Sequence, residues 1–142
     1  IIYTHSGTAP EGFYLLPGGG VEEGESYEEA LIREVHGEIG CDVKVMGKLA
    51  TAEEYRDKSA ELYKTESFAA RILFVIGSDF VPEDSLLGLE SPWIYRAEAV
   101  ELLNKQFRKI KPDTDNYYNR GFNSARDLFF VKSSMEVDMS KD

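Results

Sequence analysis

Two glutamates, Glu34 and Glu38, are separated by four residues and follow a run of three glycines, Gly18, Gly19 and Gly20. In a helix this spacing places both carboxylates on one side. Glycines lack side chains, so their backbone can approach an ion or a ligand closely. Carboxylate and carbonyl oxygens are the ligands that Mg²⁺ prefers. The pattern predicts either a divalent metal site or, as is usual for an acidic helix face, solvated surface.

The overall charge limits the partners that such a site could serve. The formal net charge is −10, from 16 Lys and Arg against 26 Asp and Glu. Affinity for nucleic acid polymers comes mainly from Lys and Arg displacing counterions, so this charge argues against a broad nucleic acid interface. A polyphosphate substrate would also be repelled unless cations intervene. A divalent metal shared between carboxylates and substrate oxygens removes that conflict.

The glutamates need a helix to hold them, and the flanking residues indicate where it begins and ends. Ser26 followed by Glu29 is the signature of a capping box at a helix start. Gly40 is typical of a helix stop, so the helix is expected to run from residue 26 to about Ile39. Its expected buried stripe consists of Leu31, Val35 and Ile39.

Strand patterns surround this helix. Apolar and aromatic runs at 1–5 and 13–17 predict a hairpin. Longer runs at 42–55 and 62–77 predict two long strands joined by a charged loop. Residues 72–76 are apolar on both faces, which indicates a central strand.

The C-terminal part is expected to be helical. A short strand at 92–96 leads into a helix at 97–104, and a last helix spans 114–131. Gly121 could interrupt that last helix, and a polar, mobile tail follows at 132–142. The expected inner side of the last helix is aromatic and small: Tyr118, Phe122, Ala125 and Phe129.

These elements predict one α/β domain over residues 1–142, with a mixed sheet flanked by helices. No run of about 18 apolar residues indicates a membrane span. Cys41 is the single cysteine, which excludes an internal disulfide and favours a reducing cytoplasm. The chain starts inside an expected strand, so this strand is expected to be incomplete.

Residues 19–41 resemble the Nudix box, a family motif of glycines, an arginine and glutamates at fixed spacing. The matching positions are Gly19, Glu25, Arg33, Glu34, Val35, Glu38 and Gly40, and Cys41 occupies the last apolar position. Gly37 departs from the motif, because it stands where the family has the first of two adjacent glutamates. The resemblance implies a Nudix-like α/β/α sandwich with the box helix packed on the sheet.

The resemblance also implies an activity, a hydrolase that uses Mg²⁺ (or Mn²⁺) to cleave the pyrophosphate bond of a nucleoside diphosphate linked to another moiety. Glu34 and Glu38 would be metal ligands, and Glu34 would also polarise water. The carbonyl of Gly18 would be a further ligand. Arg33 would pair with Glu25 and orient the loop, while Gly19, Glu25 and Gly40 would be structural.

Gly37 leaves three explanations open. A carboxylate elsewhere completes the metal site, for which Glu90 is the first candidate and Glu53 and Glu54 come next. Alternatively, the domain is a catalytically impaired Nudix-fold nucleotide-binding or regulatory domain. Otherwise, this copy carries an altered residue.

Substrate contacts are less constrained by the sequence. Arg56 and Arg71 either contact substrate phosphate or balance the excess of acids. His36 is expected to be an ordinary surface residue, and a role as a proton shuttle is the less favoured alternative. Aromatic residues could stack on a nucleobase or fill the core: Phe13, Tyr14, Tyr63 and Phe68. The expected partner is a small-molecule nucleoside diphosphate derivative, with no nucleic acid polymer and no membrane, and a homodimer is plausible.

Overall fold

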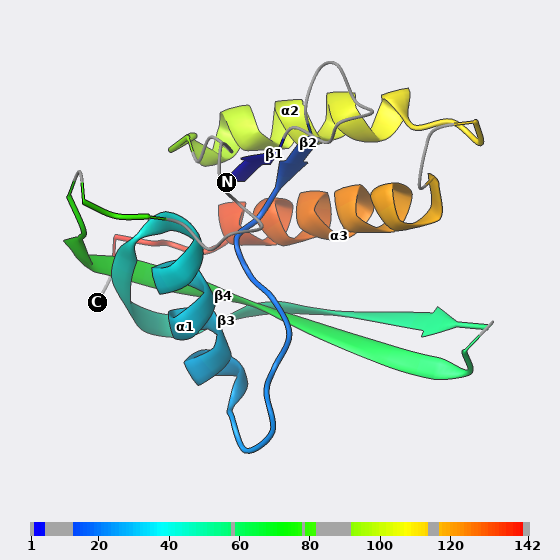
Figure 1. The fold of residues 1–142 in the computed structure, drawn as a ribbon. Coiled ribbons are helices and arrows are strands. Elements are labelled where there is room, and N and C mark those ends of the chain that lie inside the picture. Colours follow the sequence, from blue (N-terminus) through cyan, green and yellow to red (C-terminus); the bar gives the residue numbers. More distant parts are fainter. Residues whose placement is uncertain are drawn as a thin grey trace.

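The computed structural model describes residues 2–4, 13–57, 59–77, 79–81, 92–113 and 117–140, with the backbone alone for 2–4. It contains both strands and helices, which confirms the α/β class (Figure 1). Their order is β1 (Ile2–Thr4), β2 (Phe13–Leu15), α1 (Tyr27–Ile39), β3 (Cys41–Arg56), β4 (Glu61–Val75), α2 (Arg96–Lys109) and α3 (Tyr117–Met135).

The strands form two antiparallel hairpins, as the sequence predicted. In β1–β2, Tyr3 lies opposite Tyr14, and in β3–β4, Cys41 lies opposite Val75. The β3–β4 hairpin is long and extends past the helices to a tip near Arg56 (Figure 1). Within the described residues these are two separate two-stranded sheets and not the single mixed sheet expected. Strand patterns identify hairpins because their pairing is local, whereas pairing between hairpins leaves no local signal.

Helix α1 has the ends that its sequence predicts. Ser26 accepts the backbone N–H of Glu29, while the Glu29 side chain accepts the backbone N–H of Ser26. Gly40 ends the helix in the left-handed region at φ 65°. A β-carbon there would lie 2.6 Å from the ring of Phe80, so glycine also makes room for that ring. The predicted apolar stripe packs against the start of β3, through Leu31, Val35, Ile39, Cys41 and Val43.

Helices α2 and α3 run antiparallel beside one another (Figure 1). Their core joins Ala99 and Leu103 of α2 to Leu128 and Val131 of α3. Tyr14 and Leu16, in and after β2, pack against this core. No helix in the described ranges is long and apolar enough to cross a membrane.

The inner face of α3 differs from the prediction. Tyr118 and Phe129 are 56% and 48% exposed, whereas Ser124 and Asp127 are fully buried. Ala125 is also exposed and Phe122 is only half-buried. The aromatic pattern predicted the wrong inner face. A helical pattern does not show that buried polar groups can find hydrogen-bond partners elsewhere in the fold.

Element ends in the C-terminal part also differ. Residues 92–95 have no strand pairing, and α2 continues five residues beyond the predicted end, to Lys109. Gly121 does not interrupt α3, which continues to Met135. The predicted tail from 132 therefore begins inside a helix, in which Ser134 is buried.

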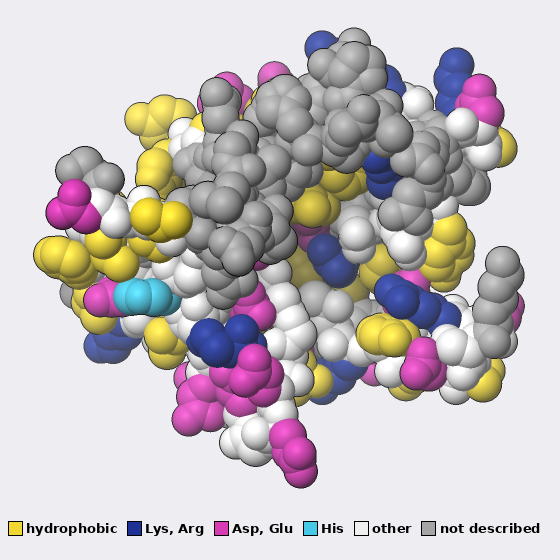
Figure 2. All heavy atoms as spheres, viewed as in Figure 1, with side chains coloured by type: hydrophobic (Ala, Val, Ile, Leu, Met, Phe, Trp, Pro, Cys, Tyr) yellow, Lys and Arg dark blue, Asp and Glu magenta, His cyan; other side chains and the backbone are white. Residues whose placement is uncertain are grey.

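The apolar end of β4 is exposed and not central. Ile72, Leu73, Phe74 and Val75 are between 43% and 65% exposed. Among the described strands β4 pairs only with β3, and helix α1 covers the start of β3 instead. Hydrophobic side chains accordingly gather at the left of the molecule, over this end of β4 (Figure 2).

Candidate active site

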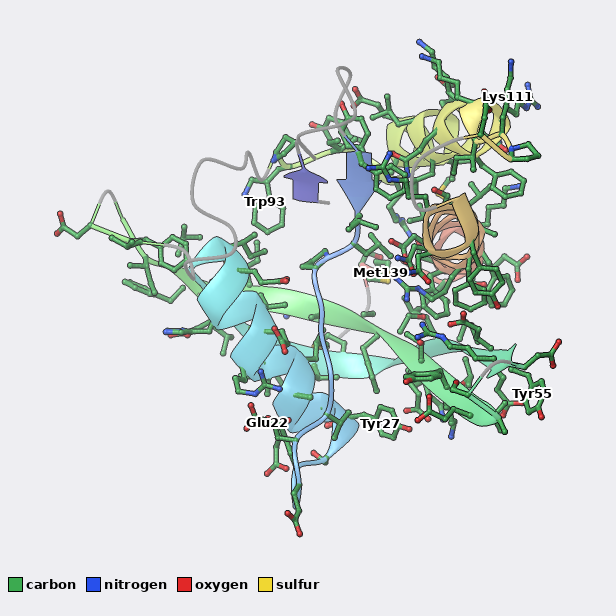
Figure 3. The ribbon with its side chains drawn as sticks, turned by 45° about the vertical axis from the view of Figure 1, so that its right-hand side comes forward. Glu22, Tyr27, Tyr55, Trp93, Lys111 and Met139 are labelled. Atoms are coloured by element: carbon green, nitrogen blue, oxygen red, sulfur yellow. The ribbon has the colours of Figure 1, made fainter. Side chains whose placement is uncertain are left out.

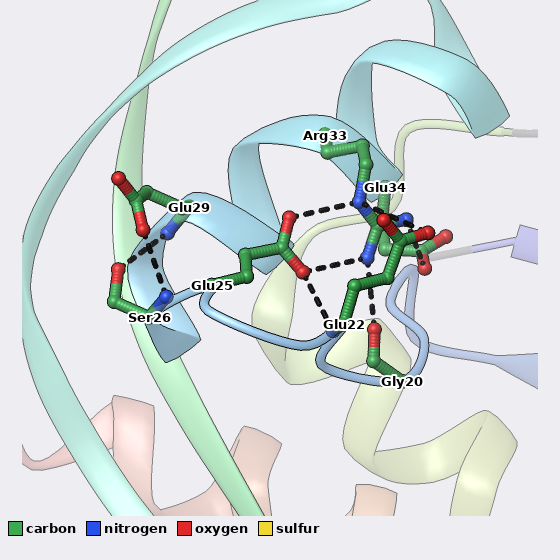
Figure 4. Close-up of polar contacts among 7 residues, drawn as sticks. All are labelled: Gly20, Glu22, Glu25, Ser26, Glu29, Arg33 and Glu34. Atoms are coloured by element: carbon green, nitrogen blue, oxygen red, sulfur yellow. Dashed lines mark hydrogen bonds and ion pairs between the residues drawn. The ribbon is translucent and has the colours of Figure 1, made fainter.

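Arg33 ties the glycine-rich turn to helix α1 (Figure 4). Its Nε and Nη2 donate to the two carboxylate oxygens of Glu25 at 2.9 and 3.0 Å. Nη1 donates to Oε1 of Glu34 at 2.7 Å, and Nη2 also donates to the carbonyl of Gly20 at 2.8 Å. A planar guanidinium suits this arrangement because its donors point in fixed directions. The predicted pairing of Arg33 with Glu25 is present in the structure.

In this network the hydrogen bonds between Arg33 and Glu25 favour the charged form of both side chains. The guanidinium of Arg33 lowers the pKa of Glu25 by hydrogen bonding, helped by the backbone N–H of Glu22. That N–H donates to Oε2 of Glu25 at 2.9 Å. In turn, hydrogen bonds to Glu25 and Glu34 raise the pKa of Arg33. The turn is therefore held by ionised groups at neutral pH.

Both glutamates of interest lie against the glycines. A β-carbon on Gly19 would lie 2.2 Å from Oε1 of Glu34, so the carboxylate fills the space beside this glycine. The backbone N–H of Gly18 donates to Oε2 of Glu38 at 2.9 Å. Gly18 has φ 151°, a conformation that side chains rarely adopt. The structure thus brings Glu34, Glu38, Gly18 and Gly19 together, as the spacing predicted.

These residues fit a metal that is shared with substrate better than a metal held by protein alone. Acidic side chains surround one basic group over the turn and α1, seen at the lower edge of Figure 2. Among the described residues, no three of the Asp, Glu, His or Cys type stand close enough to hold an ion. Mg²⁺ commonly takes one or two carboxylates plus substrate phosphates, and Glu34 and Glu38 can supply those two.

The two replacement ligands that the structure describes, Glu53 and Glu54, are not brought into a metal-binding group with Glu34 and Glu38. Glu90 lies outside the described residues. Glu54 is 6% exposed and accepts hydrogen bonds from Nε and Nη2 of Arg56 at 3.0 and 3.1 Å. Glu54 therefore forms an ion pair with Arg56 on the hairpin.

The two arginines proposed for substrate phosphate lie far apart on the long hairpin. Arg71 is opposite Lys44, and Arg56 is opposite Glu61 near the tip. The 12 steps along β3 from residue 44 to residue 56 span roughly 40 Å at about 3.3 Å per residue. Figure 3 shows this tip, marked by Tyr55, well away from Glu22 on the glycine turn. One substrate molecule cannot contact both arginines, and Arg56 already pairs with Glu54 and stacks 4.0 Å over Tyr63.

The contacts of the remaining candidate residues indicate structural roles. Nδ1 of His36 lies 2.8 Å from Asp42 on the exposed surface, which agrees with the surface interpretation. Phe13 is buried under Arg120, with the guanidinium 5.6 Å from the ring centroid. Cys41 is buried and free, and burial raises the pKa of its thiol, which disfavours a reactive role.

Two backbone groups complete the site and were missed in the sequence. The carbonyl of Gly20 is an acceptor for Arg33, and the N–H of Glu22 is a donor to Glu25. Side-chain patterns carry no information on such groups. Gly24, at φ 81°, lets the turn curl back on itself, and glycine is the residue type that adopts this conformation readily.

Comparison with known proteins agrees with this geometry. A family model described as NUDIX domain matches residues 2–114. An uncharacterized Nudix hydrolase of Nostoc sp. is 33% identical over 91 residues, which cover 62% of this chain and 49% of that protein. The chain spans about half the length of this curated relative. The family match includes the glycine turn, α1 and both hairpins, and the chain belongs to the Nudix family.

Proposed function

We propose that this domain hydrolyses the pyrophosphate bond of a nucleoside diphosphate linked to another moiety, with Mg²⁺ or Mn²⁺ as cofactor. One observation supports this most directly: Arg33 binds Glu25, Glu34 and the Gly20 carbonyl together, which fixes two carboxylates against a glycine turn. Such an arrangement presents acidic oxygens and bare backbone on one surface. It suits a crowded phosphate ligand whose charge is offset by a cation.

The roles of the residues follow from their contacts. Glu34 and Glu38 would hold the metal, and the carbonyl of Gly18 is a further candidate. A bound Mg²⁺ would neutralise phosphate oxygens and orient a water in line with the leaving group. The carboxylate of Glu34 would accept the proton of that water. Arg33 and Glu25 act through Glu34, because they hold its carboxylate and the turn in one orientation.

We further propose a small-molecule substrate, a cytoplasmic location and a homodimer. The net charge of −10 supports the first by disfavouring nucleic acid polymers. The free, buried Cys41 supports a reducing compartment. The exposed apolar side chains of β4, Leu73, Phe74 and Val75, support self-association. Light scattering coupled to size-exclusion chromatography tests the dimer, and Leu73→Lys is expected to shift it to monomer.

The activity is tested with purified protein and Mg²⁺ against nucleoside triphosphates, ADP-ribose, nucleotide sugars and dinucleoside polyphosphates. Turnover that requires the metal and is lost in Glu34→Gln is expected. Glu28→Gln is the matched control, because Glu28 is exposed on the first turn of the same helix. An intact fold with no turnover of any substrate would remove the proposal.

A second function is favoured by Gly37. This residue supplies no carboxylate, and the described residues hold no group of three metal ligands. The domain could therefore bind nucleotides without cleaving them efficiently. Nucleotide binding by calorimetry with no metal-dependent turnover would favour this regulatory role.

A further inference from the structure

Strand β2 has an unusual partner on the side away from β1. The backbone N–H of Tyr14 donates to Oε1 of Gln106 at 2.6 Å, and Nε2 of Gln106 donates to the carbonyl of Tyr14 at 2.9 Å. A side-chain amide thus makes the pair of hydrogen bonds that a neighbouring strand would make. This contact joins β2 to helix α2.

Helix α3 supplies the next contact, to the residue that directly follows β2. The backbone N–H of Leu16 donates to Oδ2 of Asp127 at 3.0 Å. Tyr14 and Leu16 are two residues apart, so these N–H groups point to the same side of an extended chain. Helices α2 and α3 together occupy the edge of β2 that a third strand would otherwise occupy.

Two buried polar side chains of α3 take part: Ser124 bonds the half-buried Gln106, and Asp127 bonds the strand segment directly. Nε2 of Gln106 also donates to Oγ of Ser124 at 2.9 Å. The other carboxylate oxygen of Asp127 accepts hydrogen bonds from Arg126, with Nε at 2.9 Å. Ser124 and Asp127 are 0% and 1% exposed. We call Gln106, Ser124 and Asp127 the β2 clamp.

The residue that Asp127 of the β2 clamp holds, Leu16, lies next to the glycine turn in the chain. Leu16 is followed by Pro17, whose ring restricts φ, and then by Gly18. Gly18 donates to Glu38, so a single residue, Pro17, separates the residue anchored to α3 from the residue anchored to α1. A shift of Leu16 would therefore pass directly to the backbone beside Glu34 and Glu38.

We propose that Asp127 and Gln106 are positioning residues that set the place of residues 18–20 against Glu34 and Glu38. The part of this inference that concerns catalysis rests on the proposed function. The positioning itself does not, because it follows from hydrogen bonds to the strand that carries the turn. The hydrogen bonds that join Gln106 and Asp127 to the N-terminal part of the chain go to Tyr14 and Leu16, so these two residues act through the segment that leads into the turn.

Asp127→Leu and Asp127→Asn separate positioning from charge. Leucine resembles aspartate in shape but cannot accept the N–H of Leu16, whereas asparagine keeps an acceptor. Ser134→Ala is the matched control, because Ser134 is buried on the same helix and its Oγ bonds Val131 within that helix. Circular dichroism checks that each variant is folded.

Three readouts are measured on the full chain. Hydrogen exchange of residues 18–20 reports the turn itself, electron paramagnetic resonance reports Mn²⁺ affinity, and steady-state kinetics separates kcat from KM. In Asp127→Leu we expect faster exchange of the turn, Mn²⁺ affinity lower by about 10- to 100-fold, and a loss mainly in kcat. Asp127→Asn and Ser134→Ala should stay close to the native protein.

A folded Asp127→Leu that matches Ser134→Ala in exchange, Mn²⁺ affinity and kcat overturns the proposal. Should Asp127→Leu fail to fold, Gln106→Met decides instead, because Gln106 is only half-buried. Native exchange of residues 18–20 in that variant overturns the proposal, and faster exchange supports it. A native protein without Mn²⁺ binding or turnover would defeat the proposed function, and hydrogen exchange would still decide the positioning.

Discussion

The carboxylate of Glu34 lies where a side chain on Gly19 would begin, since a β-carbon on Gly19 would be 2.2 Å from Oε1 of Glu34. The clash would be with the far end of a flexible side chain, so the carboxylate can move aside at little energetic cost. Its position relative to the turn and to Glu38 would then change. This relationship links a glycine of the box directly to its proposed catalytic glutamate.

Gly19→Ala is therefore expected to lower kcat on the order of 100-fold, because misplacing a catalytic group by about 1 Å has that effect. Thermal stability should change little. Gly20→Ala is the control, because no atom lies within 4 Å of a β-carbon built there. Equal activity of the two variants would contradict the assigned position of Glu34.

Arg33→Lys keeps the positive charge but removes the forked geometry. A lysine cannot bond both oxygens of Glu25, Glu34 and the Gly20 carbonyl together. We expect kcat lower by roughly 10-fold or more and faster proteolysis at the turn. Arg108→Lys on the exposed surface of α2 is the control. Native kinetics and native protease resistance in Arg33→Lys would show that the fork is dispensable.

Glu25 gives the stability of the domain a defined pH dependence. Hydrogen bonding to Arg33 lowers the pKa of Glu25 below its ordinary value of 4.5. Its contribution is therefore fully present above pH 4.5 and is lost as pH falls through the lower, folded pKa. The difference in melting temperature between native protein and Glu25→Gln should be largest near neutral pH and shrink in acid. Glu23→Gln, in the same exposed turn, is the control variant.

Gly37→Glu tests whether the departure from the family motif limits the site. An added carboxylate on α1 between Glu34 and Glu38 should raise Mn²⁺ affinity, measured by electron paramagnetic resonance, and raise turnover. Gly37→Ala is the control, because alanine stabilises a helix by about 1 kcal/mol over glycine without adding a ligand. Equal Mn²⁺ affinity in the two variants would mean that residue 37 does not contribute to the metal site.

Asp127 provides a pH dependence of opposite sign. Burial raises the pKa of Asp127 above its ordinary value of 3.8. The folded protein then binds a proton more tightly than the unfolded chain, so stability falls as pH rises from about 3.8 to the higher, folded pKa. Asparagine resembles the protonated carboxyl, so urea titrations of native protein and Asp127→Asn between pH 3 and 7 should agree best in acid and diverge as pH rises. A constant difference across this range would show that Asp127 titrates as in the unfolded chain.

Local patterns in the sequence predicted much of what surrounds the site. The capping residues Ser26 and Glu29, the stop at Gly40 and the pairing of Arg33 with Glu25 all appear where the motif placed them. Both hairpins were also correct. These features depend on residues close together in the chain, or on a spacing that one helix converts directly into geometry.

The tertiary structure decided the rest. It showed that the apolar end of β4 is exposed, that α3 buries Ser124 and Asp127 in place of an aromatic stripe, and that Arg56 and Arg71 are far apart. It also linked Gln106 and Asp127 to a strand about 100 residues earlier. Burial and hydrogen-bond partners of this kind arise when elements distant in the sequence pack together. The sequence by itself therefore determined which functional groups are present, and the packing of the elements determined which of these groups come into contact.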